Sequence, residues 1–293
     1  MVVKTAFDLL KNATPNNIRD IRKIIAHIKN ISYEQVLFSS EKIELNDDEI
    51  QNFYEFLSRY NRHEPISKII GKKDFWKHTF FVDGNVLDPR PETELIIEEI
   101  LARFNADKSF NFLDIGTGSG CILLSILSEF KKSKGIGIDI SKNAIEVAER
   151  NKNELEIDNA TFLNISWNEI FSCSKIKDMD IDIIVSNPPY IRTADINFLD
   201  ENVKNFDPHI ALDGGEDGLV AYKEICCIAK NLLRKNRKSK KSKKGKYIFL
   251  EVGYNQAEDV KNILEENGFS NISFSKDLSG INRVVIAQII QCD

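Results

Sequence analysis

The chain has 293 residues, of which 42% are hydrophobic and 29% are charged. This composition is typical of a folded globular protein and excludes extensive disorder. No apolar run approaches the roughly 20 residues that cross a bilayer, and the first residues lack a signal-peptide pattern, so we expect a cytoplasmic protein without membrane contact.

Charge is unevenly distributed along the chain. The formal net charge is −5, yet the segment from Arg234 to Lys246 holds nine of the 40 Lys and Arg residues, which leaves 31 basic against 45 acidic residues elsewhere. An acidic body disfavours direct nucleic-acid binding, which depends largely on phosphate neutralisation. The basic segment is typical of a solvated loop, with contact to a ribosome or an RNA-containing complex as the alternative. The five cysteines and four histidines are scattered, so neither a disulfide framework nor a metal site is predicted.

The first sixty residues predict a small helical domain. Isoleucines recur at helical spacing from Ile18 to Ile28, and a second stripe follows Asp47 and Asp48, which suit an N-cap. The aromatic residues of the second stripe are expected in the core: Phe53, Tyr54 and Phe56. Short β-type runs at 66–70 and 80–82 then predict a connecting hairpin. We place the helical domain at 1–64 and the hairpin linker at 65–90.

From residue 91 to 293 helices and strands alternate, which predicts an α/β domain with a mostly parallel sheet and helices on both faces. Helices are expected at 94–104, 121–130, 142–153, 219–233 and 256–266. Strands are expected at 110–115, 135–138, 161–165, 181–185, 247–252, 272–275 and 283–290. The last two strands are separated by 277–282, which is short enough for a hairpin and places an antiparallel strand in the sheet.

A glycine-rich loop follows the first strand of this domain, and we assign six of its residues to cofactor binding: Asp114, Gly116, Thr117, Gly118, Ser119 and Gly120. A dinucleotide fingerprint needs a third glycine where Cys121 stands. A carboxylate at Asp114 repels a pyrophosphate but attracts an ammonium group. The loop therefore favours S-adenosylmethionine over a nicotinamide dinucleotide.

Two residues after the next strands complete the predicted cofactor site. Asp139 ends the second strand, where an acid accepts hydrogen bonds from ribose hydroxyls; its alternative role is a helix cap, which Ser141 can already supply. Trp167 follows the third strand, where its indole either covers an adenine face or plugs the end of the sheet.

The tetrapeptide Asn187-Pro188-Pro189-Tyr190 follows an apolar strand and must end it, because proline lacks the ladder N–H and fixes its own φ. Such a loop at the carboxyl end of a strand presents an amide, carbonyl groups and an aromatic face to the ligand cleft. These groups suit a planar nitrogen substrate. The alternative is a strand-ending turn without chemistry.

These motifs together resemble a class I amino-methyltransferase, and the flanking segments resemble the release-factor glutamine methyltransferases. The flanking segments run from Leu87 to Glu94, which contains Arg90-Pro91-Glu92-Thr93-Glu94, from Phe206 to Leu219, and from Leu250 to Gln256. The resemblance covers the chain from about Gly71 onward, and a small helical N-terminal domain fits the family. Two departures are visible: Asp88 replaces an aliphatic residue, and Ser166 replaces an acid that contacts the adenine amino group.

The resemblance implies a Rossmann-like class I methyltransferase with a mostly parallel seven-stranded sheet, one antiparallel strand and an N-terminal helical domain that recognises the substrate. Its implied reaction transfers a methyl group from S-adenosylmethionine to the glutamine N5 in the Gly-Gly-Gln loop of peptide chain release factors. Asn187 would bind cofactor and substrate, Pro188, Pro189 and Tyr190 would hold the substrate, and Asn187, Pro188 and Tyr190 would carry the catalysis. The expected partner is the release factor, and the protein itself is expected to be a monomer.

Three other functions fit part of the pattern. A ribosomal-protein glutamine methyltransferase shares the chemistry, although the Arg90 to Glu94 segment favours the release-factor branch. An N6-adenine DNA methyltransferase presents the same planar NH2, but the body is acidic and lacks a separate target-recognition domain. A non-catalytic cofactor-binding module conflicts with the intact Asn-Pro-Pro-Tyr loop.

Overall fold

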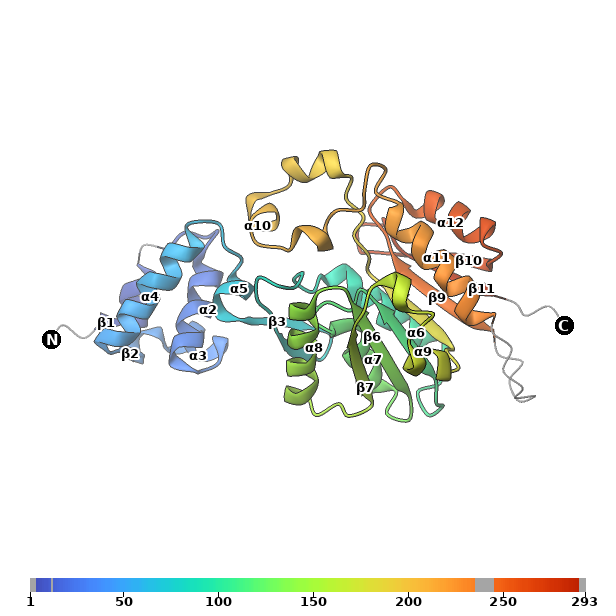
Figure 1. The fold of residues 1–293 in the computed structure, drawn as a ribbon. Helices are drawn as coiled ribbons and strands as arrows, with labels where there is room; N and C mark the ends of the chain where they lie inside the picture. Colours follow the sequence, from blue (N-terminus) through green and yellow to red (C-terminus); the bar gives the residue numbers. More distant parts are fainter. Residues whose placement is uncertain (1–3, 12, 235–244, 290–293) are drawn as a thin grey trace. The chain divides into compact units, whose positions relative to one another are not determined.

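A computed structural model describes residues 4–11, 13–234 and 245–289. The chain divides into two compact units (Figure 1). One comprises Met1–Lys72 with Asp200–Phe206, and the other comprises Lys73–Leu199 with Asp207–Asp293. The basic run at 235–244, expected as a solvated loop, lies outside the described residues.

The first unit is helical. Its helices are α1 (Ala6–Leu10), α2 (Ile18–Lys29), α3 (Tyr33–Ser39), α4 (Asp47–Tyr60), α5 (Ile66–Ile70) and α10 (Glu201–Lys204). Ile21, Ile24 and Ile25 of α2 pack with Phe53 of α4 in its core, as the helical spacing predicts. Two short strands, β1 (Lys4–Thr5) and β2 (Glu44–Leu45), pair antiparallel and were not expected from the sequence.

Three expectations for this region were wrong: the residue that caps α4, the burial of Tyr54, and a strand at 66–70. Helix α4 is capped by Asn46 rather than by Asp47 or Asp48: Glu49 N donates to Asn46 Oδ1 at 2.8 Å and Asn46 N donates to Glu49 Oε2 at 2.9 Å, a reciprocal capping box. Tyr54 is 49% exposed, because it lies on the flank of the helix whose inner face carries Phe53.

The run 66–70, expected as a strand, is helix α5. Its apolar residues at 66, 69 and 70 fit a helical turn as well as a strand. Gly71 then ends the helix with a left-handed φ of 69°. The β-hairpin therefore begins later, with β3 (Lys72–Phe75) and β4 (His78–Phe81).

The second unit is an α/β domain whose described residues form a seven-stranded sheet in the order β10-β11-β9-β8-β5-β6-β7. The strands are β5 (Asn111–Ile115), β6 (Lys134–Asp139), β7 (Ala160–Asn164), β8 (Ile183–Ser186), β9 (Lys246–Glu251), β10 (Ser270–Lys276) and β11 (Asn282–Ile289). The run from β7 to β9 is parallel, and β11 is antiparallel to both β9 and β10. The predicted class I sheet with one antiparallel strand is confirmed.

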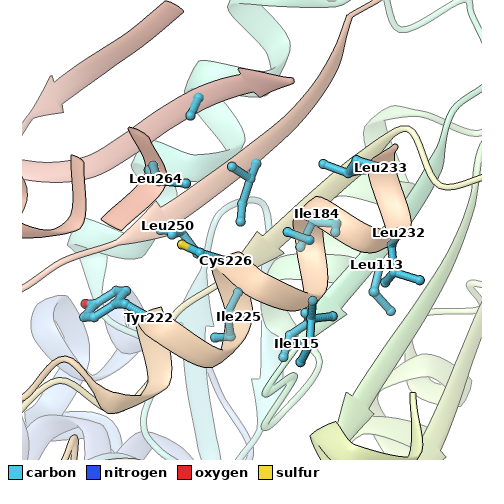
Figure 2. Packing of buried hydrophobic residues seen from close by; sticks show 14 of the residues in the cluster. Leu113, Ile115, Ile184, Tyr222, Ile225, Cys226, Leu232, Leu233, Leu250 and Leu264 are labelled. Carbon is cyan, nitrogen blue, oxygen red and sulfur yellow. The ribbon is translucent and has the colours of Figure 1, made fainter. Parts of the chain in front are cut away.

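Helices cover both faces of this sheet. They are α6 (Glu94–Arg103), α7 (Cys121–Glu129), α8 (Lys142–Glu154), α9 (Ser174–Asp178), α11 (Val220–Leu233) and α12 (Ala257–Glu266). Alternate residues of each central strand point to opposite faces, so that Leu113 and Ile115 pack with α11 and α12, whereas Phe112 packs with α6 and α7. Figure 2 shows Ile225 and Leu232 of α11 next to Leu113 and Ile115, on the face of the sheet that α11 covers.

Lys246 belongs to this core, not to the basic loop in which the sequence placed it. It is the first residue of β9 and is only 6% exposed. Its Nζ lies 2.6 Å from Asp180 Oδ1, so the buried charge is paired. In the part of the chain that the structure describes, every helix is too short or too polar to cross a membrane.

Candidate active site

A cavity of about 570 Å³ opens in the second unit at the carboxyl ends of the parallel strands. It is bordered by the segments that follow β5, β6, β7 and β8, by the start of α11 and by the loop before it. Its lining residues are Val86, Leu87, Thr93, Gly116, Thr117, Gly118, Ser119, Cys121, Ile122, Asp139, Ile140, Ser166, Trp167, Asn168, Asn187, Pro189, Ile210, Ala211, Asp213, Gly214, Gly215, Val220, Ala221 and Glu224. This edge is where open α/β sheets bind their ligands.

The glycine loop forms one wall of the cavity, and its three glycines have different structural roles. Gly116 and Gly118 have φ values of +73° and +53°, and among the described residues nothing lies within 4 Å of a Cβ built on either. A ligand can therefore approach their backbone closely. A Cβ on Gly120 would instead lie 2.9 Å from Phe162 Cζ, so this glycine serves packing under α7.

Asp114, assigned to the cofactor, is fully buried beneath the loop and does not line the cavity. Thr117 Oγ1 donates a hydrogen bond to Asp114 Oδ2 at 2.7 Å, while Oδ1 has no partner among the described residues. Burial raises the pKa of the Asp114 carboxyl to about 7. Its direct role is to brace the loop that faces the ligand.

Asp139 lines the cavity at the end of β6. Gly118 N donates to Asp139 Oδ2 and Ser141 N to Oδ1, both at 2.9 Å. Ser141 itself caps α8, accepting a hydrogen bond from Ala144 N. Asp139 thus ties the glycine loop to the neighbouring strand, and burial raises the pKa of its carboxyl. Each oxygen keeps a second lone pair for a ligand hydroxyl.

Trp167 and Ser166 lie on the cavity wall after β7. Ser166 caps the 3₁₀ turn Trp167–Glu169, in which Ser166 N and Oγ donate to Glu169 Oε2 at 2.8 and 2.7 Å. The hydroxyl hydrogen of Ser166 is therefore occupied within the turn. Ser166 orients the loop that carries Trp167 and offers a ligand only the acceptor side of its oxygen.

Asn187 lines the cavity directly after β8. Its Nδ2 donates to Thr93 Oγ1 at 3.2 Å, whereas its buried Oδ1 has no hydrogen-bond partner in the described part of the chain. An unsatisfied buried acceptor is costly, so one at a cavity wall suits a ligand donor. Pro189 also lines the cavity, while Pro188 and Tyr190 do not. Burial raises the pKa of Tyr190 to about 12, so its hydroxyl stays neutral.

The segments around Gly214 and Gln256 hold this loop from behind. Gln256 Nε2 donates to the carbonyl oxygens of Tyr190 and Gly218 at 3.0 and 3.1 Å. A Cβ on Gly214 would lie 2.8 Å from the Pro189 carbonyl oxygen, so only glycine permits this approach. Through Gly214 and Gly218, the segment from Phe206 to Leu219 supports the Asn-Pro-Pro-Tyr loop. The segment from Leu250 to Gln256 supports it through Gln256.

Sequence reasoning missed the apolar rim of the cavity. Ile140, Ile210 and Val220 are 49–59% exposed and come from three different loops or helix starts. A single exposed apolar residue carries no signal in a sequence. Only their convergence on one cavity identifies them. No group of side chains able to hold a metal ion occurs among the residues described.

Known proteins resemble this chain over most of its length. A family model described as a methyltransferase domain matches residues 106–268, and one described as a PrmC N-terminal domain matches residues 2–71. The release factor glutamine methyltransferase of Caulobacter vibrioides is 40% identical over 244 residues, which cover 83% of this chain and 80% of that protein. The corresponding protein of Fusobacterium nucleatum is 35% identical over 281 residues, 96% of this chain and 75% of that one.

Among solved structures, the hMettl16 catalytic domain in complex with MAT2A 3'UTR hairpin 6 has a TM-score of 0.54 at 14% identity, covering 85% of this chain and 84% of that one. At this identity the likeness shows a shared fold alone. The sequence matches extend through both units and include the segments that build the cavity. The chain therefore belongs to the release factor glutamine methyltransferase family.

Proposed function

We propose that this protein transfers a methyl group from S-adenosylmethionine to the side-chain amide nitrogen of the glutamine in the Gly-Gly-Gln loop of peptide chain release factors. The observation that carries the proposal is Asn187, a residue of the cavity wall whose buried Oδ1 has no hydrogen-bond partner among the described residues. Membership of the family supports the substrate. Release factors act in translation, so we place the activity in the cytoplasm.

The cavity fits the cofactor on three counts. Gly116 and Gly118 leave open space above the loop, Asp139 offers acceptors for ribose hydroxyls, and Trp167 presents an indole for an adenine face. Asp114, buried behind Thr117, keeps the loop in shape. When bound, S-adenosylmethionine supplies an electrophilic methyl group on a sulfonium centre.

The chain's own residues position the glutamine. An amide nitrogen is a weak nucleophile, because its lone pair is delocalised into the carbonyl. The Asn187 amide would accept one N–H of the substrate, which helps to aim the nitrogen at the methyl group. Positioning of this kind contributes several kcal/mol to catalysis.

Proton release follows from the same geometry. The methylated nitrogen becomes positively charged and strongly acidic, so its proton leaves late, to a carbonyl oxygen or to water. No histidine is among the described residues that line the cavity, and this mechanism requires none. Tyr190, held neutral by burial and packed against the core, would support the Asn-Pro-Pro-Tyr loop rather than act as a base.

The helical first unit is proposed to recognise the release factor. A single glutamine side chain carries little selectivity, so a second surface at a distance from the reacting amide must discriminate between proteins. The second unit already contains the whole cavity. The helical unit is therefore free to serve this purpose.

The test is to incubate the protein with S-adenosylmethionine and purified substrates and to locate the added mass by mass spectrometry. We expect a 14-dalton increase on the glutamine of the release-factor Gly-Gly-Gln loop. A release factor with asparagine in place of this glutamine is the control. Transfer to ribosomal proteins or to adenine in DNA, with none to the release factor, would refute the proposal.

A further inference from the structure

The hairpin of β3 and β4 is packed onto the core of the second unit. Phe75 and Phe80 are buried in the same cluster as apolar residues of α6 and α7. Trp76 N donates a hydrogen bond to Glu94 Oε1 at 2.7 Å, and Trp76 Nε1 donates to Glu129 Oε1 at 2.8 Å. Glu94 is the first residue of α6 and Glu129 is the last of α7. These two helices therefore hold the hairpin in place.

A single side chain joins this hairpin to the glycine loop. Asn151 of α8 is only 1% exposed. Phe81 N donates to Asn151 Oδ1 at 2.7 Å, and Asn151 Nδ2 donates to the carbonyl oxygens of Phe81 and Ser119 at 3.0 and 2.9 Å. Phe81 ends β4, and Ser119 lines the cavity. Three hydrogen bonds thus connect segments that lie 70 and 32 residues from Asn151 in the chain.

The partners of Asn151 fix the orientation of its amide. A backbone N–H can only donate, so the amide oxygen must face Phe81 N. A backbone carbonyl can only accept, so the amide nitrogen must face the carbonyl oxygens of Phe81 and Ser119. The flipped amide would lose all three hydrogen bonds and would place like groups against each other. Both hydrogens of the amide nitrogen are therefore used, one on the hairpin and one on the glycine loop.

The glycine loop needs such outside contacts to keep one shape. Gly116 and Gly118 have positive φ values, and glycine backbones have wide conformational freedom. On the side of β6, Gly116 N donates to the Ile138 carbonyl oxygen and Gly118 N to Asp139 Oδ2, both at 2.9 Å. Asn151 holds the other end of the loop, at Ser119. A loop released at this end would have to be ordered again when a ligand binds, which lowers the affinity.

We infer that Asn151 is a positioning residue for the cofactor, which holds the glycine loop in its binding conformation and anchors it to the hairpin. Asn151 is not among the residues that line the cavity, so it acts through Ser119. This inference rests on the cofactor part of the proposed function and does not depend on the methyl acceptor.

The experiment compares two substitutions of similar size. Asn151→Leu removes all three hydrogen bonds. Asn151→Asp keeps an acceptor for Phe81 N but loses both donors, including the one to Ser119. We expect both variants to bind S-adenosylhomocysteine about 5- to 20-fold more weakly than wild type, measured by calorimetry on protein that circular dichroism shows to be folded. Wild-type affinity in Asn151→Asp would overturn the inference, and this variant decides the matter if the leucine variant does not fold.

The matched control is Asn159→Ala. Asn159 Nδ2 donates to the Ser133 carbonyl oxygen at 2.9 Å, just before β7 and β6 begin, at the edge of the sheet opposite the cavity. This variant should lower the free energy of unfolding and leave the affinity for S-adenosylhomocysteine within about twofold. An affinity loss equal to that of Asn151→Leu would show general structural damage and would overturn the inference.

Kinetics provide a second readout that loss of stability alone would not produce. In both Asn151 variants the KM for S-adenosylmethionine should rise, while kcat at saturating cofactor stays within about threefold of wild type, because Asn187 is untouched. A fall in kcat with an unchanged KM would contradict a role in holding the cofactor loop.

Failure of the two proposals can be told apart, because the binding experiment uses no methyl acceptor. A wild-type protein that binds S-adenosylhomocysteine but methylates no release factor refutes the proposed acceptor, and the binding data still decide the role of Asn151. An active wild-type protein whose Asn151 variants bind S-adenosylhomocysteine normally refutes the role of Asn151 alone.

Discussion

Asn187 carries two separable hydrogen-bonding groups: an amide nitrogen bound to Thr93 and a buried oxygen without a partner among the described residues. We predict that Asn187→Ala lowers the methyl-transfer rate about 10²- to 10³-fold, because it removes an acceptor aimed at the reacting amide. S-adenosylmethionine binding, measured by calorimetry, should stay measurable. A variant with near-normal turnover on a release factor would contradict the positioning mechanism.

Asp139 acts on the other side of the cavity. We predict that Asp139→Ala weakens S-adenosylmethionine binding about 10- to 100-fold, because hydrogen bonds to a charged group contribute about 1.5–3 kcal/mol. The loss combines ligand contact with release of Gly118 N from Oδ2. Asp139→Asn is the matched control, since it keeps one acceptor oxygen and should lose less. Unchanged affinity in the alanine variant would rule out the ribose contact.

At the scale of the element, the glycine loop separates binding from packing. Gly118→Ala should lower cofactor affinity more than stability: its φ of +53° costs about 1–2 kcal/mol, but its Cβ would project into open space next to the cavity without a clash. Gly120→Ala should lower the unfolding free energy by roughly 2–4 kcal/mol, since both a positive φ and a contact of 2.9 Å to Phe162 oppose a side chain. Calorimetry and urea unfolding measure the two effects. The reverse ranking would contradict the division of roles.

At the scale of the whole molecule, two buried carboxyls govern part of the pH dependence of stability. Burial raises the pKa of Asp114 from 3.8 and that of Glu251 from 4.5, both to about 7. A raised acid pKa means that the folded state holds its proton longer than the unfolded state. The contribution to stability is therefore full below the unfolded pKa and is lost as the pH rises to about 7.

Glu251→Gln isolates this effect. Relative to wild type, the variant should gain roughly 3 kcal/mol of unfolding free energy between pH 4.5 and pH 7.5, because a neutral amide escapes the cost of ionisation. Urea unfolding at the two pH values measures the difference. A constant difference between variant and wild type would show that Glu251 titrates near its ordinary pKa.

The helical unit provides the last prediction. Deleting residues 1–72 should leave the affinity for S-adenosylmethionine within a few-fold, because the cavity is built from the second unit alone. The Michaelis constant for an intact release factor should rise sharply, whereas activity on a short Gly-Gly-Gln peptide should change much less. Circular dichroism must first show a folded truncate, because residues 200–206 lose their unit. Equal efficiency on the intact release factor would assign recognition elsewhere.

The order of the elements in the second unit and its local chemistry follow from the amino-acid sequence alone. Alternating apolar runs predicted the parallel sheet, and the short connection between β10 and β11 predicted the antiparallel strand. The glycine loop and the Asn-Pro-Pro-Tyr loop were recognisable because glycine and proline act on their own backbone, wherever the rest of the chain lies. Where local patterns were ambiguous, as at 66–70, the prediction was wrong.

Tertiary structure decided which of these residues meet and which are buried. Asp114 and Gly120 belong to the glycine motif, yet they face the core, while Gly118 and Asp139 face the cavity. Thr93 and Asn187 are far apart in the sequence, yet Asn187 Nδ2 donates a hydrogen bond to Thr93 Oγ1 in the folded chain. Strand register and burial depend on every element packed around them. No local pattern in the chain encodes these contacts.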